Sequence, residues 1–263
     1  TSLVLLQAQQ KLNEAAAVMS PRYATVNPAA NAGLVEGMKG LFNPTDTISK
    51  QFKNGMMGMG VLGLDEINMS QSIKQFTTGT RNSTGTVNTT VTTEGSNTIV
   101  LAGVGNALTI KAGDVFTVAG VYSVNPQTRE STGSLQQFVV VADAVSNSGG
   151  VATVTVSPAM YTSGHALATI TSLPAASAVT TFVGAASSQY PQNLVYHKDA
   201  ITFATADLLM PQGVDMASRQ VHNGISMRIV RQYDINNDRL PCRIDVLYGY
   251  SVIRPQMGVR LWG

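Results

Sequence analysis

Charged side chains are scarce in this sequence: Asp, Glu, Lys and Arg make up 12% of its 263 residues, against about a quarter in an ordinary soluble domain. With so few charges, much of the surface must carry small polar side chains or be covered by other subunits. The second possibility favours an assembly. The formal net charge of +2 is too small to indicate nucleic-acid binding by itself.

Cysteine is almost absent too. Cys242 is the single cysteine, so the chain cannot form an internal disulfide and gives no sign of an oxidising compartment. No apolar run approaches the roughly 20 residues that a membrane-spanning helix needs, and no signal peptide is visible. The sequence begins at Thr1 and not at Met, which predicts either processing or a further segment upstream.

Catalytic and cofactor-binding motifs are also missing. The three histidines are not paired at metal-ligand spacing, one cysteine cannot complete a zinc site, and no P-loop, nucleophile elbow or H-E-x-x-H motif occurs. Gly58, Gly60 and Gly63 form a G-x-G-x-x-G pattern, but a helix is predicted before it, where a dinucleotide site needs a strand. We therefore expect a flexible glycine loop there, no metal, no cofactor and no enzymatic activity.

The first third of the chain mixes helix and strand signals. Apolar spacing predicts an amphipathic helix over residues 2–19 and a short strand over 22–26. Asn27, a good N-cap residue placed before a proline, predicts the start of a second helix that Gly40 ends. A third helix is predicted over about residues 45–53. Helix, strand and helix in quick succession indicate an α/β layer.

From about residue 73 to 188 the composition changes, because Thr, Ser, Gly, Val and Ala dominate and charges nearly vanish. Short extended runs separated by turn residues predict a small all-β barrel or sandwich. The predicted strands cover residues 84–92, 98–102, 114–122, 137–142 and 151–156. An all-β block between stretches of α/β character is best explained as a domain inserted into a loop of its host.

The closing segment predicts a long antiparallel hairpin, with strands over 226–233 and 242–250 and an Asp/Asn/Pro-rich turn between them. Alternate residues of the second strand are apolar, which is typical of a strand buried on one face. The apolar positions are Cys242, Ile244, Val246, Tyr248 and Tyr250, and the opposite positions include Arg243, Asp245 and Gly249. Cys242 is therefore expected to be a buried, inert thiol, and Pro255 is expected at a bulge or a sheet edge.

The carboxyl-terminal residues also carry a family resemblance. Cys242–Tyr250, followed by Ile253–Pro255 and Gly258–Gly263, resembles the end of major capsid (coat) proteins of tailed bacteriophages, and most of all the podovirus type with a barrel inserted in the apical domain. Residues 111–121 and 135–141 are similar to that inserted barrel. The likeness is densest from Asn193 to Gly263 and weakest in the Thr-rich centre.

The resemblance implies an α+β fold of the phage major capsid (Johnson) type. It places the first part of an apical α/β domain at residues 1–72, an inserted β-barrel at 73–188, the second part of the apical domain at 189–235, and the final strands of a peripheral domain at 236–263. It also implies an amino-terminal arm, an extended loop and a long spine helix in sequence upstream of Thr1.

The function implied is that of a structural major capsid protein, which self-assembles in the host bacterial cytoplasm into the icosahedral shell of a virion enclosing double-stranded DNA. Expected partners are copies of the chain itself, as hexamers and pentamers, together with a scaffolding protein, a portal and non-specific contacts to packaged DNA. No membrane and no small-molecule substrate are expected. The candidate subunit-interface residues are Arg228, Arg231, Arg243, Asp245, Arg254, Arg260, Tyr248, Tyr250 and Trp262.

Two other interpretations of the sequence remain open at this point, one for its carboxyl-terminal aromatic residues and one for its centre. The aromatic residues could stack on nucleic-acid bases, although their place among valines favours core or subunit contacts. The Thr/Ser-rich centre also fits a β-rich phage tail or decoration module that binds a partner. Such a module predicts small defined oligomers, whereas a coat protein predicts rings, capsomers or shells.

Overall fold

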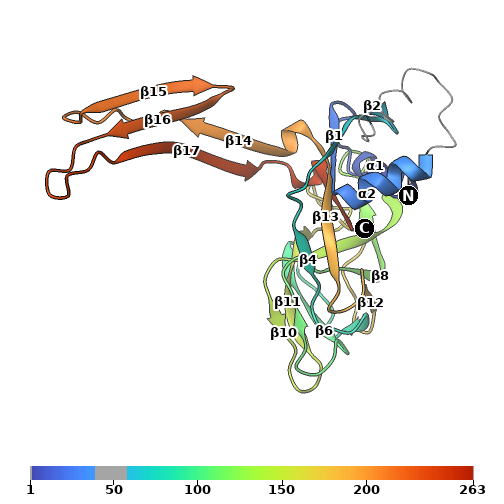
Figure 1. The fold of residues 1–263 in the computed structure, drawn as a ribbon. Coiled ribbons are helices and arrows are strands. Elements are labelled where there is room, and N and C mark those ends of the chain that lie inside the picture. The colour runs from blue at the N-terminus through green and yellow to red at the C-terminus, as the bar shows by residue number, and fades with distance from the viewer. Residues whose placement is uncertain (1, 39–57, 263) are drawn as a thin grey trace. The chain divides into compact units, whose positions relative to one another are not determined.

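The computed structural model describes residues 2–38 and 58–262 and divides the chain into two compact units (Figure 1). The first unit contains Thr1–His197 and Gln256–Gly263, and the second contains Lys198–Pro255. No helix in the described ranges is long and apolar enough to cross a membrane.

The first unit is built on a six-stranded mixed sheet with the order β18-β13-β1-β3-β2, and β4 pairs with the beginning of β13. Strand β1 is parallel to β3 and antiparallel to β13. The bounds are β1 (Arg22–Val26), β2 (Gly58–Val61), β3 (Leu64–Met69), β4 (Gln75–Thr77), β13 (Gln189–His197) and β18 (Gly258–Trp262). The strand predicted over residues 22–26 is thereby confirmed.

Helix α1 (Ser2–Glu14) buries Leu5, Ala8 and Leu12, the apolar stripe that the sequence predicts. It ends five residues earlier than expected. The reason is the guanidinium of Arg22, which donates hydrogen bonds of 2.8 Å to the carbonyl oxygens of Ala17 and Val18 and to the side chain of Asn13. These bonds hold the chain after Glu14 in a non-helical turn.

Helix α2 (Pro28–Met38) begins as predicted. The side-chain oxygen of Asn27 accepts a 3.1 Å hydrogen bond from the backbone N–H of Ala30, which is the geometry of an N-cap. The predicted end at Gly40 and the predicted helix over 45–53 lie outside the described residues.

The described part of the glycine-rich segment is an antiparallel hairpin of β2 and β3, which corrects the expectation of a flexible loop. Leu62 and Gly63 both have positive φ angles, 54° and 70°, as a two-residue hairpin turn of type I′ requires. Residues 64–69 after the turn are extended as β3. A hairpin lacks the strand-to-helix turn on which a dinucleotide-binding fingerprint depends.

Between β4 and β13 the chain forms a closed six-stranded barrel with the strand order β11-β6-β5-β12-β8-β9. The bounds are β5 (Thr84–Val87), β6 (Ser96–Ala102), β8 (Val115–Val124), β9 (Ser131–Val140), β11 (Ala152–Met160) and β12 (Val179–Phe182), with a small ribbon of β7 (Thr109–Ile110) and β10 (Ala144–Val145). The five predicted strands overlap five of these. The sequence analysis missed β12, because four residues set among Ala and Ser give little alternation.

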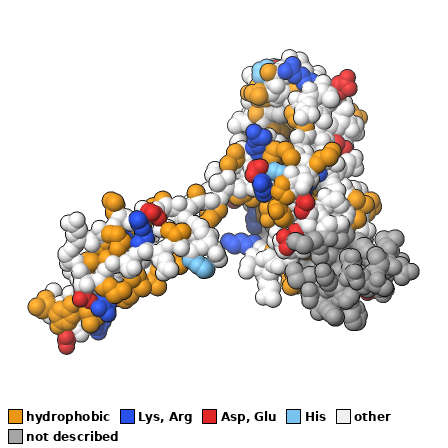
Figure 2. Space-filling model, turned by 90° about the horizontal axis from the view of Figure 1, so that it is seen from above, with side chains coloured by type: hydrophobic (Ala, Val, Ile, Leu, Met, Phe, Trp, Pro, Cys, Tyr) orange, Lys and Arg blue, Asp and Glu red, His pale blue; other side chains and the backbone are white. Residues whose placement is uncertain are grey.

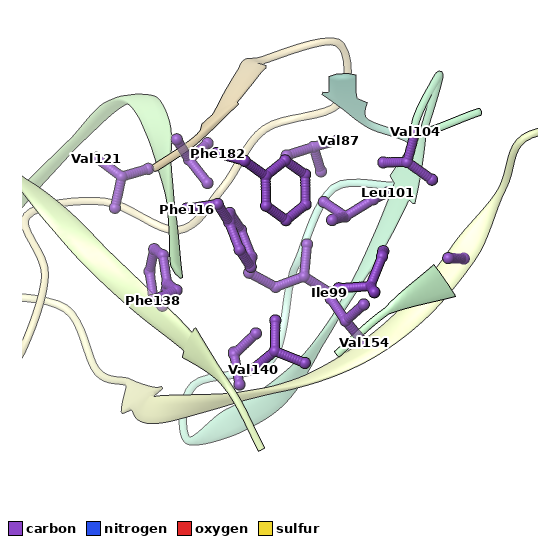
Figure 3. Packing of buried hydrophobic residues seen from close by; sticks show 14 of the residues in the cluster. Val87, Ile99, Leu101, Val104, Phe116, Val121, Phe138, Val140, Val154 and Phe182 are labelled. Atoms are coloured by element: carbon purple, nitrogen blue, oxygen red, sulfur yellow. The ribbon is translucent and has the colours of Figure 1, made fainter. Parts of the chain in front are cut away.

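Aromatic side chains fill the centre of the barrel (Figure 3). The Phe116 ring lies 5.8 Å from the Phe138 ring and 5.2 Å from the Phe182 ring, centroid to centroid. Ile99 and Leu101 of β6 are at most 1% exposed beside them. A small barrel whose inward side chains pack together is a core and not a ligand cavity.

Lys11 on α1 contacts the barrel, because its ammonium group donates a hydrogen bond to the side-chain oxygen of Gln137 on β9. Burial removes water from this ammonium group and lowers the pKa of Lys11 to about 8, although the charge of Glu14 acts in the opposite direction. A lysine that is harder to protonate in the folded state than in the unfolded state destabilises the fold below its folded pKa.

We predict that the free energy of unfolding rises as the pH increases from 8 to about 10, because the unfolded chain then binds more protons at Lys11 than the folded chain does. Lys11→Met removes this contribution, and Lys74→Met, at an exposed position, retains it. Urea unfolding at several pH values measures the difference. If the free energy of unfolding rises equally with pH in the wild type and in Lys11→Met, the prediction is wrong.

The second unit is an antiparallel sheet of four strands, in which β17 pairs with β14 and with β16, and β16 also pairs with β15. The bounds are β14 (Ile201–Ala206), β15 (Met216–His222), β16 (Ile225–Arg231) and β17 (Cys242–Val252), with short 3-10 turns η1 (Lys198–Ala200) and η2 (Pro255–Met257) at its two ends. The pairing of β16 with β17 confirms the predicted hairpin. Pro255 opens the η2 turn and does not lie at a bulge or an edge as predicted.

Candidate interaction surface

The strand register of the second unit divides its sheet into two chemically different faces. Residues directly opposite each other on paired strands point to the same face. Tyr250 lies opposite Phe203, and Val246 lies opposite Met227, so these four side chains share one face. Asp245 lies opposite Arg228 on the other face. The alternation predicted for residues 242–250 is therefore present in the structure.

One face, called the apolar face below, carries large hydrophobic side chains that remain exposed. Their exposed fractions range from 38% to 77%. The members are Ile201, Phe203, Met216, Ile225, Met227, Ile244, Val246, Tyr248, Tyr250 and Val252. Figure 2 shows hydrophobic side chains gathered over this part of the chain. Apart from contacts within the sheet, such as the stacking of Phe203 and Tyr248 at 6.0 Å, nothing in the described chain covers them.

This exposure corrects two expectations. Strand β17 was expected to be buried on one face, and Cys242 to be a buried thiol, but β17 is exposed along almost its whole length and Cys242 is an exposed free cysteine. The physical reason is that alternation shows which side chains a strand would bury. It does not show whether a second layer is present within the chain to bury them.

The opposite face, called the polar face below, holds a compact ion-pair network. The carboxylate of Asp245 forms ion pairs with two guanidinium groups, that of Arg228 at an N–O distance of 2.5 Å and that of Arg243 at 2.8 Å. The hydrogen bond from Arg228, followed by that from Arg243 and by both positive charges, lowers the pKa of Asp245 below its ordinary value. Arg231, at the end of β16, lies opposite Met216 and Cys242 on the other face and pairs with Asp215 at 2.8 Å. The arginines of this face are thus engaged within the chain.

The loop between β16 and β17 is ordered by its own side chains. Asp234 accepts a bond of 3.1 Å from the backbone N–H of Asn236 and one of 2.8 Å from the Asn237 amide, and these bonds lower its pKa. The hydroxyl of Tyr233 donates to Asp238 at 2.8 Å, which raises the pKa of Tyr233. The loop presents Ile235, 79% exposed, at its tip.

Two of the predicted interface residues belong to the first unit. Arg260 donates a 2.6 Å hydrogen bond to the carbonyl oxygen of Gly113 in the barrel, and its guanidinium lies 5.1 Å from the Trp262 ring. Trp262 in turn stacks on Tyr190 at 5.1 Å. Burial lowers the pKa of Arg260, an effect that the charge of Asp114 opposes. These side chains join β18 to the barrel within the first unit.

Arg254 lies in the second unit, just after β17. Its side chain is exposed, and its backbone N–H donates to the carbonyl oxygen of Ala200 at 3.4 Å. The structure therefore brings Arg228, Arg243 and Asp245 together on the polar face and places Arg231 at the end of β16, on the apolar side of the same sheet. Tyr248 and Tyr250 lie on the apolar face.

Sequence analysis missed a buried ion pair where the chain enters and leaves the barrel. Arg81 and Asp114 have no exposed side-chain surface, and their nearest nitrogen and oxygen atoms are 3.3 Å apart. Arg81 also donates to the carbonyl oxygen of Val183 at 3.0 Å and lies over the Phe182 ring at 4.3 Å. The one available signal was the presence of opposite charges in a segment that is otherwise nearly uncharged.

No group of three or more His, Cys, Asp or Glu side chains that could hold a metal ion occurs among residues 2–38 and 58–262. The sheet of the second unit has an exposed hydrophobic face and, on its other face, charged side chains held in ion pairs. Such a surface is suited to binding another protein surface.

The sequence matches the family model described as "P22 coat protein - gene protein 5" over residues 5–263. The chain belongs to the P22 coat protein family. Among solved structures it is similar to the "CUS-3 coat protein I-domain", with 26% identity over 39% of this chain and 96% of that chain and a TM-score of 0.30. A search of curated proteins found no match.

Membership of the P22 coat protein family confirms the resemblance drawn from residues 242–263. The chain is a tailed-phage major capsid protein with a structural role in the capsid. Its sheet-rich α+β architecture with a six-stranded barrel fits a phage coat fold. The matching family is described as a coat protein and not as a tail or decoration module.

Within this coat protein, the predicted residues account for only part of the exposed surface. The sequence analysis missed the contribution of β14, which adds Ile201 and Phe203 to the apolar face. The alternation Ile-Thr-Phe-Ala at residues 201–204 was a usable signal for a strand. Its pairing with β17, more than forty residues later, was not visible in the sequence.

Proposed function

We propose that this P22-family coat protein self-assembles into a closed icosahedral shell around double-stranded DNA, and that the apolar face of the second unit is buried between protein segments in that shell. The observation that carries the proposal is the apolar face itself. Monomeric soluble proteins rarely expose contiguous hydrophobic patches beyond a few hundred Å².

The energy available from this face is large. Full burial of one Val, Leu, Ile, Phe or Met side chain contributes roughly 1.5–3 kcal/mol, and ten large side chains lie on the face. Association also has an entropic cost that offsets much of the gain. In a closed symmetric assembly the same contact is repeated in every subunit, so a modest contact becomes collectively strong.

The domain assignment is part of this proposal. Residues 1–72 and 189–235 form the apical domain of a Johnson-type fold, 73–188 form the inserted barrel, and 236–263 form strands of the peripheral domain. Support comes from the closed barrel between β4 and β13 and from the pairing of β1 with β13, which joins the segments on either side of the barrel.

The interface residues proposed from the sequence are retained as a group. Tyr248 and Tyr250 are the best placed, because they are 61% and 77% exposed on the apolar face. Arg243 and Arg254 are exposed and can reach a neighbouring subunit. Arg260 has its hydrogen bond within the first unit, which leaves it a supporting role. Because the chain belongs to a coat protein family, a scaffolding protein, a portal and packaged DNA are its proposed partners. Assembly in the host cytoplasm is proposed on the same ground.

The test is a pair of matched substitutions on the two faces of the sheet. Ile244, on the apolar face, is 66% exposed, and Val221, on the polar face, is 57% exposed. Both positions lie in strands, so Asp carries a similar intrinsic cost at each. We predict that Ile244→Asp lowers the yield of closed particles at least roughly tenfold, because burial of an unpaired carboxylate costs several kcal/mol.

Val221→Asp is expected to leave the particle yield within about twofold of wild type. Yields are measured by negative-stain microscopy and sedimentation, with and without a candidate scaffolding protein, and circular dichroism checks that each variant folds. Equal yields from the two folded variants would exclude the apolar face from the shell contacts. Small defined oligomers and no shells from the wild-type chain would count against the capsid function itself.

A further inference from the structure

Strand β17 has one edge without a partner in the described chain. It pairs with β14 through residues 247–252 and with β16 through residues 242–246, so these two strands occupy successive lengths of β17. The hydroxyl of Thr205 on β14 donates a 2.7 Å hydrogen bond to the carbonyl oxygen of Gly224, which directly precedes β16. Two strands on opposite edges of a third are about 9.6 Å apart, twice the strand spacing. Therefore β14 and β16 lie along the same edge of β17.

Figure 1 shows the same arrangement, with β14 and β16 both on one side of β17. Among the described residues, no backbone hydrogen bond joins residues 242–252 to any segment other than these two strands. The opposite edge of an eleven-residue strand is consequently open. Natural sheets protect long edges with proline, bulges or short strands, yet β17 has no proline and its pairing shows no register shift.

We propose that the open edge of β17 pairs antiparallel with the same edge of β17 in a second copy of the chain, about a two-fold axis at Leu247. This inference rests on the proposed self-assembly and names one contact within it. The occupant is a second copy because the strand is complementary to itself. The register centred on Leu247 pairs all eleven residues, from Cys242 opposite Val252 to Val252 opposite Cys242.

Two features of that register support it. It pairs even-numbered residues with even-numbered residues, so the apolar faces of the two sheets become one continuous surface: Ile244 meets Tyr250 of the second copy, and Val246 meets Tyr248. It also sets no like charges opposite each other, because Arg243 faces Ser251 and Asp245 faces Gly249 of the second copy. Like charges directly opposite each other destabilise a strand pair.

Cysteine pairs test this register. In a Cys242→Ser background, Leu247→Cys is expected to give disulfide-linked dimers when the associated protein is oxidised mildly, because two directly opposed residues are about 4.5–5.5 Å apart. Ala204→Cys is the control, since it is exposed on the same face of β14 but away from the open edge. Val252→Cys is expected to form dimers with the native Cys242 present and none in the Cys242→Ser background.

Each outcome decides the matter. Dimers from Leu247→Cys and from the Cys242–Val252→Cys pair, with none from Ala204→Cys, support the two-fold pairing. Shells or capsomers that form without these cross-links overturn the edge pairing and leave the capsid function standing. The pairing is also overturned if hydrogen exchange finds the β17 amides equally protected in the monomer and in the particle, because the edge is then filled within the chain. A protein that never associates overturns both proposals.

Discussion

Arg81→Met is expected to lower the free energy of unfolding of the barrel by about 3 kcal/mol, because it leaves the buried carboxylate of Asp114 without its cation. Asp114 keeps two backbone donors, the N–H groups of Gly79 at 3.2 Å and Lys111 at 2.9 Å, which places the loss at the lower end of the range for a broken buried pair. Urea unfolding and hydrogen exchange of barrel amides measure it.

The matched control is another Arg–Asp pair of nearly equal length. Arg219 and Asp207 are 3.4 Å apart and 39% and 52% exposed, so Arg219→Met should change stability by less than about 1 kcal/mol. The double variant Arg81→Met with Asp114→Asn is expected to recover part of the loss, because Asn still accepts from both backbone donors and carries no charge. The explanation fails if Arg81→Met is as mild as Arg219→Met.

The buried pair also carries a cost in the native protein. Burial lowers the pKa of Arg81, and the charge and hydrogen bond of Asp114 only partly compensate. Two of the guanidinium nitrogens, Nε and Nη1, are buried without a hydrogen-bond partner. What the pair provides is a defined position for the segments that enter and leave the barrel, since Arg81 also binds the carbonyl oxygen of Val183. An apolar pair of similar volume would not fix these backbones.

Phe116→Ala is expected to destabilise the barrel by about 3–5 kcal/mol, because it removes a ring from the centre of a closed core and leaves a cavity. Phe116 is 0% exposed and contacts the rings of Phe138 and Phe182. The same change at Phe203, which is 56% exposed on the apolar face, should alter the stability of the unassociated chain by less than about 1 kcal/mol.

The two phenylalanine variants also separate folding from assembly. Phe116→Ala should shift the unfolding midpoint of the barrel in denaturant, whereas Phe203→Ala should mainly reduce particle yield, since its ring is buried only when the apolar face is covered. Circular dichroism against urea and particle counts on the same preparations give both quantities. A large loss of monomer stability in Phe203→Ala would mean that the apolar face already has a cover within the chain.

Much of the local structure could be predicted from the sequence. The N-cap at Asn27, the strand over 22–26, the barrel strands and the final hairpin follow from φ preferences and from side-chain alternation, which act over a few residues. The end of α1 could not be predicted, because Arg22 ends that helix from the next strand. The helix predicted over 45–53 lies outside the described residues.

The candidate surface was predictable only as a list of residues. Alternation along residues 242–250 identified which side chains share a face, and the concentration of arginines identified the charged face. Alternation could not separate Arg228, which pairs with Asp245 on the polar face, from Arg260, which binds the barrel. The difference arises because Arg228 lies on β16, which pairs with β17, whereas Arg260 lies on β18, which pairs with β13.

By itself the sequence determined the family of this coat protein, its inserted barrel pattern and the two-sided chemistry of its last hairpin, because these depend on residue identity and on neighbours along the chain. Only the tertiary structure decided that, within residues 2–38 and 58–262, nothing covers the apolar side of the second sheet and no strand pairs with the second edge of β17. It also decided that Arg81 and Asp114 meet in the interior. These features arise from pairings between segments far apart in sequence, and local residue preferences carry no information about such partners.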